Sequence, residues 1–145
     1  MNDFDEKIFK MSKAPSRKVL IVDDEQDLLE VMAERMQTLG MDVSTSTSPL
    51  EAIEMMKLES FDAIIIDLMM PGMDGFKFLK NLRTQDPEVR VILLTAHATI
   101  EMTKMAMKLG ASDLIEKPAD LKLLVEKIKR KKAPRKAGKD IFEGK

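Results

Sequence analysis

The sequence predicts an α/β fold, a doubly wound five-stranded parallel sheet with helices on both of its faces. Short apolar segments alternate five times with segments of helical periodicity, which is the pattern of consecutive βα units. The apolar segments in the middle of the chain are continuous β-branched runs, as in strands that are buried on both faces. With 145 residues, of which 44 % are hydrophobic and 34 % charged, the chain is long enough for one domain with a hydrophobic core.

The first two βα units have predicted strands that differ in polarity. The segment 18–24 (KVLIVDD) is apolar up to its acidic end, and the helix that follows it ends at Gly40. The segment 41–47 (MDVSTST) is more polar, as expected of a strand at the edge of the sheet. Ser48 followed by Pro49 predicts the start of the next helix, which extends through residue 58. The inward side chains are predicted to be Leu28, Met32, Met36 and Leu39 in the first helix, and Ala52, Ile53 and Met56 in the second.

The other three βα units have more apolar strands. Continuous apolar runs predict strands at 61–67 (FDAIIID) and 89–96 (VRVILLTA), and the last strand is predicted at 112–117 (SDLIEK). Helices are predicted at 75–84, with Phe76, Leu79 and Leu82 inward; at 99–109, ended by Gly110; and after Pro118, with Leu121, Leu124, Val125 and Ile128 at i, i+3, i+4 and i+7.

The predicted domain covers residues 17–132, and both ends of the chain lie outside the alternating pattern. Residues 1–16 form an N-terminal extension, and residues 133–145 form a basic C-terminal tail or linker stub. From residue 130 onward, seven basic and two acidic side chains give a charge of +5, which leaves −6 for the rest of a chain whose net charge is −1. The tail has no interleaved aromatic residues and no helix-turn-helix pattern, so nucleic acid is not expected as a partner of this chain alone.

The residues that the chain lacks exclude several classes of protein. The sequence has no cysteine, which excludes disulfides, thiolate metal sites and thiol nucleophiles. His97 is the single histidine, so a histidine-based metal cluster cannot form within one chain. No apolar run approaches the roughly 20 residues of a membrane span, and the N-terminus lacks the apolar core of a signal peptide. We therefore expect a cytoplasmic protein without membrane contact.

Every predicted strand except the polar edge strand ends in a charged or reactive side chain. In an open parallel sheet, ligands bind outside the carboxyl ends of the strands. The first strand ends in acids, the third in an aspartate, the fourth in a threonine and the fifth in a lysine, whereas the amino ends show no such pattern. The residues that gather at this edge are Asp23, Asp24, Glu25, Asp67, Thr95 and Lys117.

These residue types fit phosphoryl transfer. Carboxylates in one crevice repel each other unless a cation lies between them, and oxygen ligands without histidine or cysteine select Mg²⁺ or Mn²⁺. A carboxylate such as Asp67 can also act as a nucleophile and form an aspartyl-phosphate. Lys117 supplies positive charge for the phosphoryl oxygens and Thr95 a neutral hydroxyl. Each residue alone also fits a structural role, such as a helix cap, a satisfied hydroxyl or a solvated charge; the combination favours a phosphorylation site.

The motifs at this edge resemble those of response-regulator receiver domains, the phosphoacceptor modules of two-component signalling. The similarity covers about residues 18–131, most of the chain. It implies a flavodoxin-like (βα)5 fold with strand order 2-1-3-4-5. The matching motifs are Val19–Glu25, DLMMPGMDG at 67–75, LLTA at 93–96 and EKP at 116–118.

The resemblance implies a role for each motif residue. Asp67 corresponds to the phosphorylated aspartate, Asp24 to a direct Mg²⁺ ligand and Asp23 to an acid that acts on the metal through water. Thr95 corresponds to the hydroxyl that swings onto the phosphoryl group, and Lys117 to the ammonium that pairs with it. The family has a cis peptide bond where this chain has Lys117-Pro118. The metal ligands implied in this way are Asp23, Asp24, Asp67 and the backbone carbonyl of Met69.

Two further positions are expected to tune the switch. The family often has Tyr or Phe where this chain has Leu114, so coupling here is expected to run through repacking of the leucine or through the helix at 99–109. His97 occupies a position at which the family tunes the access of water to the acyl phosphate, although a plain loop histidine fits the sequence equally well.

The predicted function is that of a signalling switch rather than an enzyme, although the domain catalyses its own phosphotransfer and autodephosphorylation. The expected partners are a sensor histidine kinase and a downstream protein or output domain, which reads the face of the helix at 99–109, the strand at 112–117 and the final helix. Two alternatives remain at this stage: a pseudo-receiver that acts as an interaction module, and a Mg²⁺-dependent phosphohydrolase with an aspartyl-phosphate intermediate. A flavodoxin is disfavoured, because DDEQD after the first strand would repel the phosphate of a flavin.

Overall fold

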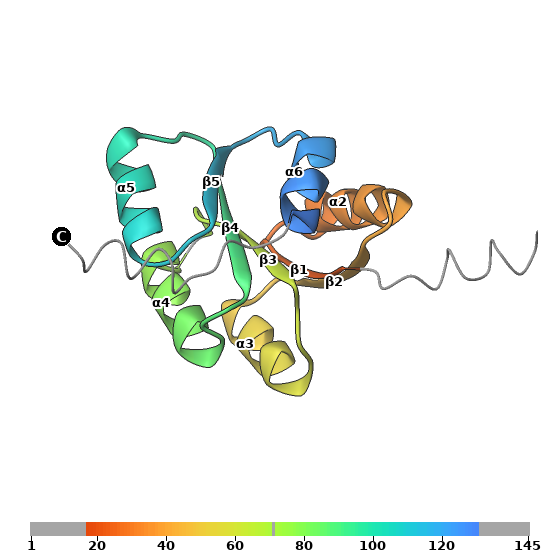
Figure 1. Cartoon of the computed structure of the whole chain (residues 1–145), viewed down its shortest axis with the longest axis horizontal. Helices are drawn as coiled ribbons and strands as arrows, with labels where there is room; N and C mark the ends of the chain where they lie inside the picture. Colours follow the sequence, from red (N-terminus) through yellow and green to blue (C-terminus); the bar gives the residue numbers. More distant parts are fainter. Residues whose placement is uncertain (1–16, 71, 131–145) are drawn as a thin grey trace, which may run out of the picture.

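The structure, a computed structural model, describes residues 17–70 and 72–130 and contains five parallel strands in the order β2-β1-β3-β4-β5. Each strand is followed by a helix, and the first four of these helices lead the chain back to the next strand (Figure 1). The predicted α/β class and the strand order 2-1-3-4-5 are confirmed. The strands are β1 (Lys18–Val22), β2 (Asp42–Ser46), β3 (Ala63–Asp67), β4 (Arg90–Thr95) and β5 (Asp113–Glu116), and the helices are α2 (Gln26–Thr38), α3 (Pro49–Leu58), α4 (Gly75–Gln85), α5 (Ile100–Lys108) and α6 (Leu121–Lys129).

The limits predicted for the domain and its flanking segments remain a prediction. Residues 1–16 and 131–145 lie outside the described residues, so the N-terminal extension and the basic tail are not placed. Within 17–70 and 72–130, no helix is long and apolar enough to cross a membrane.

The two faces of the sheet carry separate hydrophobic clusters. Successive residues of a strand point to opposite faces, so β1 contributes Leu20 and Val22 to one cluster and Val19 and Ile21 to the other. Helices α3, α4 and α5 cover the first cluster, and α2 and α6 cover the second (Figure 1). The polar strand β2 lies at one edge as predicted, whereas all residues of β3 are buried in the middle of the sheet.

The inward faces of two helices differ slightly from the prediction. In α2 the fully buried leucine is Leu29, while Leu28 is half-buried. Residues 29, 32 and 36 follow the i, i+3, i+7 pattern, so Leu29 rather than Leu28 joins Met32 and Met36 in the buried stripe. In α4, Phe78 is buried and Phe76 is half-buried for the same reason. The apolar arc of each helix is wider than one row of side chains, and its centre is set by the contact with the sheet.

Helix capping leaves the acids at the ends of β1 and β3 free for another role. The Oδ1 atom of Asp74 accepts hydrogen bonds from the backbone N–H groups of Phe76 and Lys77, so Asp74 rather than Asp67 caps α4. Helix α2 begins after Glu25, whose side chain makes no capping hydrogen bond. Strand β1 ends at Val22, two residues before the predicted limit, so the acids that follow lie in the loop beyond the strand.

Candidate functional site

Three aspartates converge at the carboxyl ends of β1 and β3. The register of these strands pairs Val22 with Ile66, so the next residues, Asp23 and Asp67, lie side by side at the edge of the sheet. One carboxylate oxygen from each of Asp23, Asp24 and Asp67 lies within 4.8 Å of the other two. Asp23 is 2 % exposed and Asp67 is 6 % exposed, whereas Asp24 is open to solvent. The predicted cluster is therefore brought together by the strand register.

Backbone amides fix the orientation of the two buried carboxylates. The N–H of Met69 donates to Oδ1 of Asp67 at 3.0 Å, and the N–H of Glu25 donates to Oδ1 of Asp23 at 3.0 Å. The loop after β3 is held in turn by a bond of 2.7 Å from the N–H of Leu68 to the carbonyl oxygen of Leu94. These short local turns hold one oxygen of each acid and leave the second oxygen, Oδ2, facing the site.

Lys117 is the cation that faces these acids. Its Nζ atom lies 3.0 Å from Oδ2 of Asp67 and 3.7 Å from Oδ2 of Asp23. Its backbone N–H donates to the carbonyl oxygen of Thr95 at 2.7 Å, and its peptide bond to Pro118 is cis. The ammonium of Lys117, which directly follows β5, thus contacts both buried carboxylates.

The pKa values reflect this crowding of charge. Burial raises the pKa of Asp23 above 3.8 and the charge of Asp67 adds to the effect, although the amide of Glu25 and the charge of Lys117 oppose it. Burial lowers the pKa of Lys117, but the hydrogen bond and charge of Asp67, with the charges of Asp23 and Glu25, outweigh burial and raise that pKa above 10.5. Lys117 is therefore protonated at neutral pH. Burial disfavours the ionised form of Asp23, and a further cation beside it would stabilise that form.

Thr95 is buried at the end of β4 and engages its own loop. It is 1 % exposed, and its Oγ1 lies 3.3 Å from the backbone nitrogen and 3.4 Å from the carbonyl oxygen of His97. These long contacts hold the hydroxyl loosely. The hydroxyl is therefore at the predicted edge of the sheet, bonded to the loop rather than to Asp67.

The two predicted tuning residues, His97 and Leu114, and the predicted metal ligand Met69 occupy different environments. The side chain of His97 is exposed in the loop between β4 and α5. Leu114 is half-buried on β5 and packs against the cluster that α3, α4 and α5 cover. The side chain of Met69 is 64 % exposed beside the loop that carries Asp67. Only the side chain of Leu114 among these three is packed into the fold.

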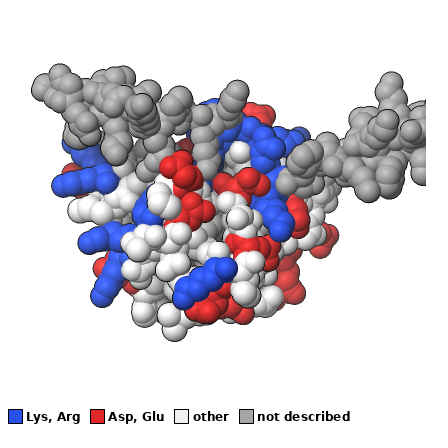
Figure 2. All heavy atoms as spheres, turned by 60° about the horizontal axis from the view of Figure 1, so that its bottom comes forward, with Lys and Arg blue, Asp and Glu red and all other residues white. Residues whose placement is uncertain are grey.

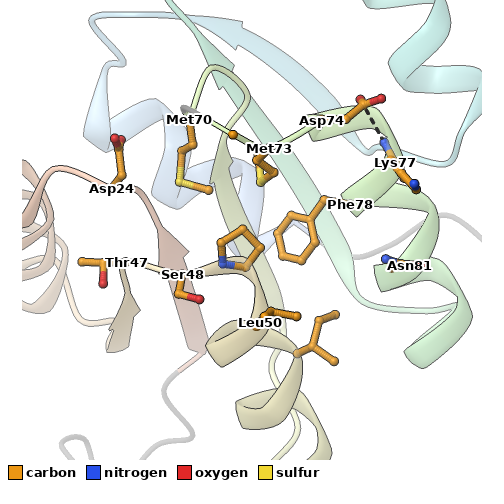
Figure 3. Close-up of a pocket in the computed structure, with 13 residues that line it drawn as sticks. Asp24, Thr47, Ser48, Leu50, Met70, Met73, Asp74, Lys77, Phe78 and Asn81 are labelled. Atoms are coloured by element: carbon orange, nitrogen blue, oxygen red, sulfur yellow. Dashed lines mark hydrogen bonds between the residues drawn. The ribbon is translucent and has the colours of Figure 1, made fainter.

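The residues present fit a hard divalent cation. The donors are carboxylate oxygens, without sulfur or imidazole, which is the ligand set of Mg²⁺ or Mn²⁺. The raised pKa of Asp23 supports this assignment, because a buried carboxylate beside another carboxylate is stabilised by a bound cation. A pocket of about 390 Å³ opens beside this cluster, between α3 and α4, with Asp24 and Met70 at its upper rim and Leu50 and Phe78 in its walls (Figure 3).

Acidic and basic side chains are interspersed over the face of the molecule seen in Figure 2, so no broad field of one sign covers that face.

Glu116 also lies at this edge, although the sequence motifs assign it no role. The backbone N–H of Ala98 donates to Oε1 of Glu116 at 2.9 Å, which connects the loop after β4 to the end of β5. Its partner is a backbone amide in a loop, which leaves no signal in the pattern of side chains. The sequence shows Glu116 beside Lys117, but not this contact.

Comparisons with known proteins agree with this geometry. The family model described as "Response regulator receiver domain" matches residues 19–129. The chain is 30 % identical over 115 residues to sporulation initiation phosphotransferase F of Bacillus subtilis, which covers 79 % of this chain and 93 % of that protein. It is 35 % identical over 126 residues to the C4-dicarboxylate transport transcriptional regulatory protein DctD of Rhizobium meliloti. That match covers 87 % of this chain, but the chain spans only 27 % of the length of that relative. The solved structure of the chemotaxis protein CheY4 of Vibrio cholerae matches with a TM-score of 0.74 at 30 % identity, over 80 % of this chain and 98 % of that one.

Proposed function

Because the chain belongs to the family of response regulator receiver domains, we propose that it is a cytoplasmic phosphoacceptor switch in which Asp67 takes a phosphoryl group from the histidine of a sensor kinase. The observation that carries the proposal is the contact of 3.0 Å between Nζ of Lys117 and Oδ2 of Asp67, within a cluster of three aspartates. A buried carboxylate with one oxygen held by an amide and the other facing a cation is prepared for attack at phosphorus.

The proposed divalent cation is Mg²⁺ or Mn²⁺. Asp24, Asp67 and the backbone carbonyl of Met69 would hold it directly, and Asp23 would hold it through water. When bound, the cation neutralises charge on the phosphoryl oxygens. The affinity for it falls at low pH, because the carboxylates must be ionised to bind it.

The residues of the chain itself have distinct parts in the proposed transfer. Oδ2 of Asp67 forms a bond to phosphorus as the bond between phosphorus and the donor nitrogen or oxygen breaks, and the leaving group keeps the electron pair of that bond. The amide of Met69 holds Oδ1 and so keeps the carboxylate oriented. Lys117 turns from the free carboxylate to the phosphoryl oxygens, and Thr95 exchanges its contact with His97 for one of them.

The proposed readout is the face formed by α5, β5 and α6. Four large apolar side chains are exposed on α5 and α6: Ile100, Met105, Met107 and Leu123. Exposed apolar side chains of this kind suit contact with a partner protein or output domain. The ordered acids and lysine favour an active phosphoacceptor over a pseudo-receiver, and no observation favours a phosphohydrolase.

The test is the intact mass of the protein after incubation with Mg²⁺ and acetyl phosphate. We expect the wild type to gain one phosphoryl group, and Asp67→Ala or removal of the metal with a chelator to abolish the gain. The control is the circular dichroism spectrum of the variant, which should match that of the wild type. An unmodified wild type would contradict the proposal, and accelerated hydrolysis of acetyl phosphate without an adduct would point to the phosphohydrolase instead.

A further inference from the structure

A single side chain ties the loop between β4 and α5 to the end of β5. The N–H of Ala98 donates to Oε1 of Glu116 at 2.9 Å, across 18 positions of sequence. Thr95 and Glu116 are partners in the parallel register of β4 and β5, so their side chains leave the same face of the sheet. The carboxylate of Glu116 therefore lies over the loop that begins at Thr95.

The Thr95 hydroxyl is bonded to the same loop. Oγ1 of Thr95 contacts the backbone of His97, the residue before Ala98. For this hydroxyl to reach a phosphoryl group on Asp67, it must leave His97, and the loop must adjust around it. Any group that fixes Ala98 resists that adjustment.

Leu114 cannot make the same connection. It is the preceding residue on this face of β5 and pairs with Leu93, one layer deeper in the sheet than Thr95. It has no polar side-chain atom and packs into the core. The position that faces Thr95 is that of Glu116, directly before Lys117.

We propose that Glu116 is a positioning residue that holds the loop at 96–99 in its resting place and so sets how readily Thr95 reaches the phosphoryl group on Asp67. The proposal rests on the proposed function of Asp67. Phosphorylation draws Thr95 away from His97, and the contact between Glu116 and Ala98 opposes this movement. Loss of the contact shifts the population of loop positions toward the one that phosphorylation requires.

The contact itself is tested in the unphosphorylated protein by the hydrogen exchange of the Ala98 amide. Glu116→Ala is expected to speed this exchange about fivefold, since one hydrogen bond is lost. Glu116→Gln keeps a carbonyl acceptor and is expected to stay within about twofold of the wild type. Glu126→Ala, an exposed glutamate of α6, removes the same charge elsewhere and should change nothing. Unchanged exchange in Glu116→Ala overturns the proposal.

The link to Thr95 is tested by a double-mutant cycle on the rate of phosphorylation by acetyl phosphate. Glu116→Ala is expected to raise the rate about fivefold, with Glu116→Gln close to the wild type. In a Thr95→Ala background, Glu116→Ala is expected to have no effect. If Glu116→Ala changes the rate of phosphorylation equally in both backgrounds, or in neither, the positioning role of Glu116 is overturned while the proposed function of Asp67 stands. A wild type that gains no phosphoryl group overturns the proposed function as well.

Discussion

Replacing Lys117 with methionine is expected to slow phosphorylation of Asp67 by acetyl phosphate about a hundredfold, because the side-chain ammonium that contacts the attacking carboxylate is removed. The same variant is expected to lose about 2 kcal/mol of unfolding free energy, since Asp23 and Asp67 keep their charges without the ammonium that lies 3.7 and 3.0 Å from them. The measurements are the time course of the intact mass at saturating Mg²⁺ and urea unfolding without metal.

The pH dependence of this loss of stability has a defined sign. The pKa of Lys117 is raised above 10.5 in the folded protein, so the ion pair stabilises the fold fully below that value. Its contribution disappears as the pH rises through the raised pKa. The difference in stability between wild type and Lys117→Met should therefore be constant around neutral pH and shrink above about pH 10.5.

A matched control is available on α6. Nζ of Lys127 pairs with Oδ2 of Asp113 at 2.7 Å, and its side chain is 25 % exposed against 24 % for Lys117. Lys127→Met should cost less than about 1 kcal/mol and leave the rate of phosphorylation unchanged. Equal rates in Lys117→Met and the wild type would contradict the role of Lys117.

Replacing Asp23 with asparagine is expected to lower the affinity for Mg²⁺ at least about tenfold and to stabilise the metal-free protein by about 1 kcal/mol. Burial raises the pKa of Asp23, so its charge destabilises the metal-free fold, while asparagine keeps the oxygen that accepts from the N–H of Glu25. The measurements are calorimetric titration with Mg²⁺ and urea unfolding in a chelator. Fluorescence is unsuitable because the chain has no Trp or Tyr.

The gain in stability should depend on pH. Between 3.8 and the raised pKa of Asp23, the folded protein holds this proton more tightly than the unfolded chain, so the contribution of Asp23 to stability falls as the pH rises through that window. The advantage of Asp23→Asn should therefore be greatest at neutral pH and vanish near pH 3.8. The control is Asp24→Asn at an exposed position, which should weaken Mg²⁺ binding with little change in stability. A metal-free Asp23→Asn that is less stable than the wild type would contradict this account.

The sequence was sufficient to predict the arrangement of the site because each strand delivers its terminal residue to the same edge. Continuous runs such as Ile64–Ile66 are distinctive of strands buried in a parallel sheet, and the alternation with helices fixes their direction. Once the strands are parallel, Asp23, Asp67 and Lys117 must lie at the same edge of the sheet, and the order of the strands decides that they meet. The order of the strands required the resemblance to a known family.

Other features depend on packing and on backbone contacts, which side-chain patterns do not report. Leu28 and Leu29 are equally apolar, and the contact between α2 and the sheet decides which of them is buried. The bonds of Thr95 to His97 and of Glu116 to Ala98 involve backbone atoms of a loop, whose path is not encoded by periodicity. The sequence therefore predicted which residues meet and left the resting position of the Thr95 hydroxyl open.

The most direct test of the central claim is to locate the phosphoryl group on the chain. Borohydride reduces an aspartyl phosphate to homoserine, so protein incubated with Mg²⁺ and acetyl phosphate can be reduced, digested and sequenced by mass spectrometry. We predict homoserine at position 67 in the wild type, and none there when the metal is chelated. Homoserine at Asp23, Asp24 or another aspartate, with position 67 unmodified, would contradict the account.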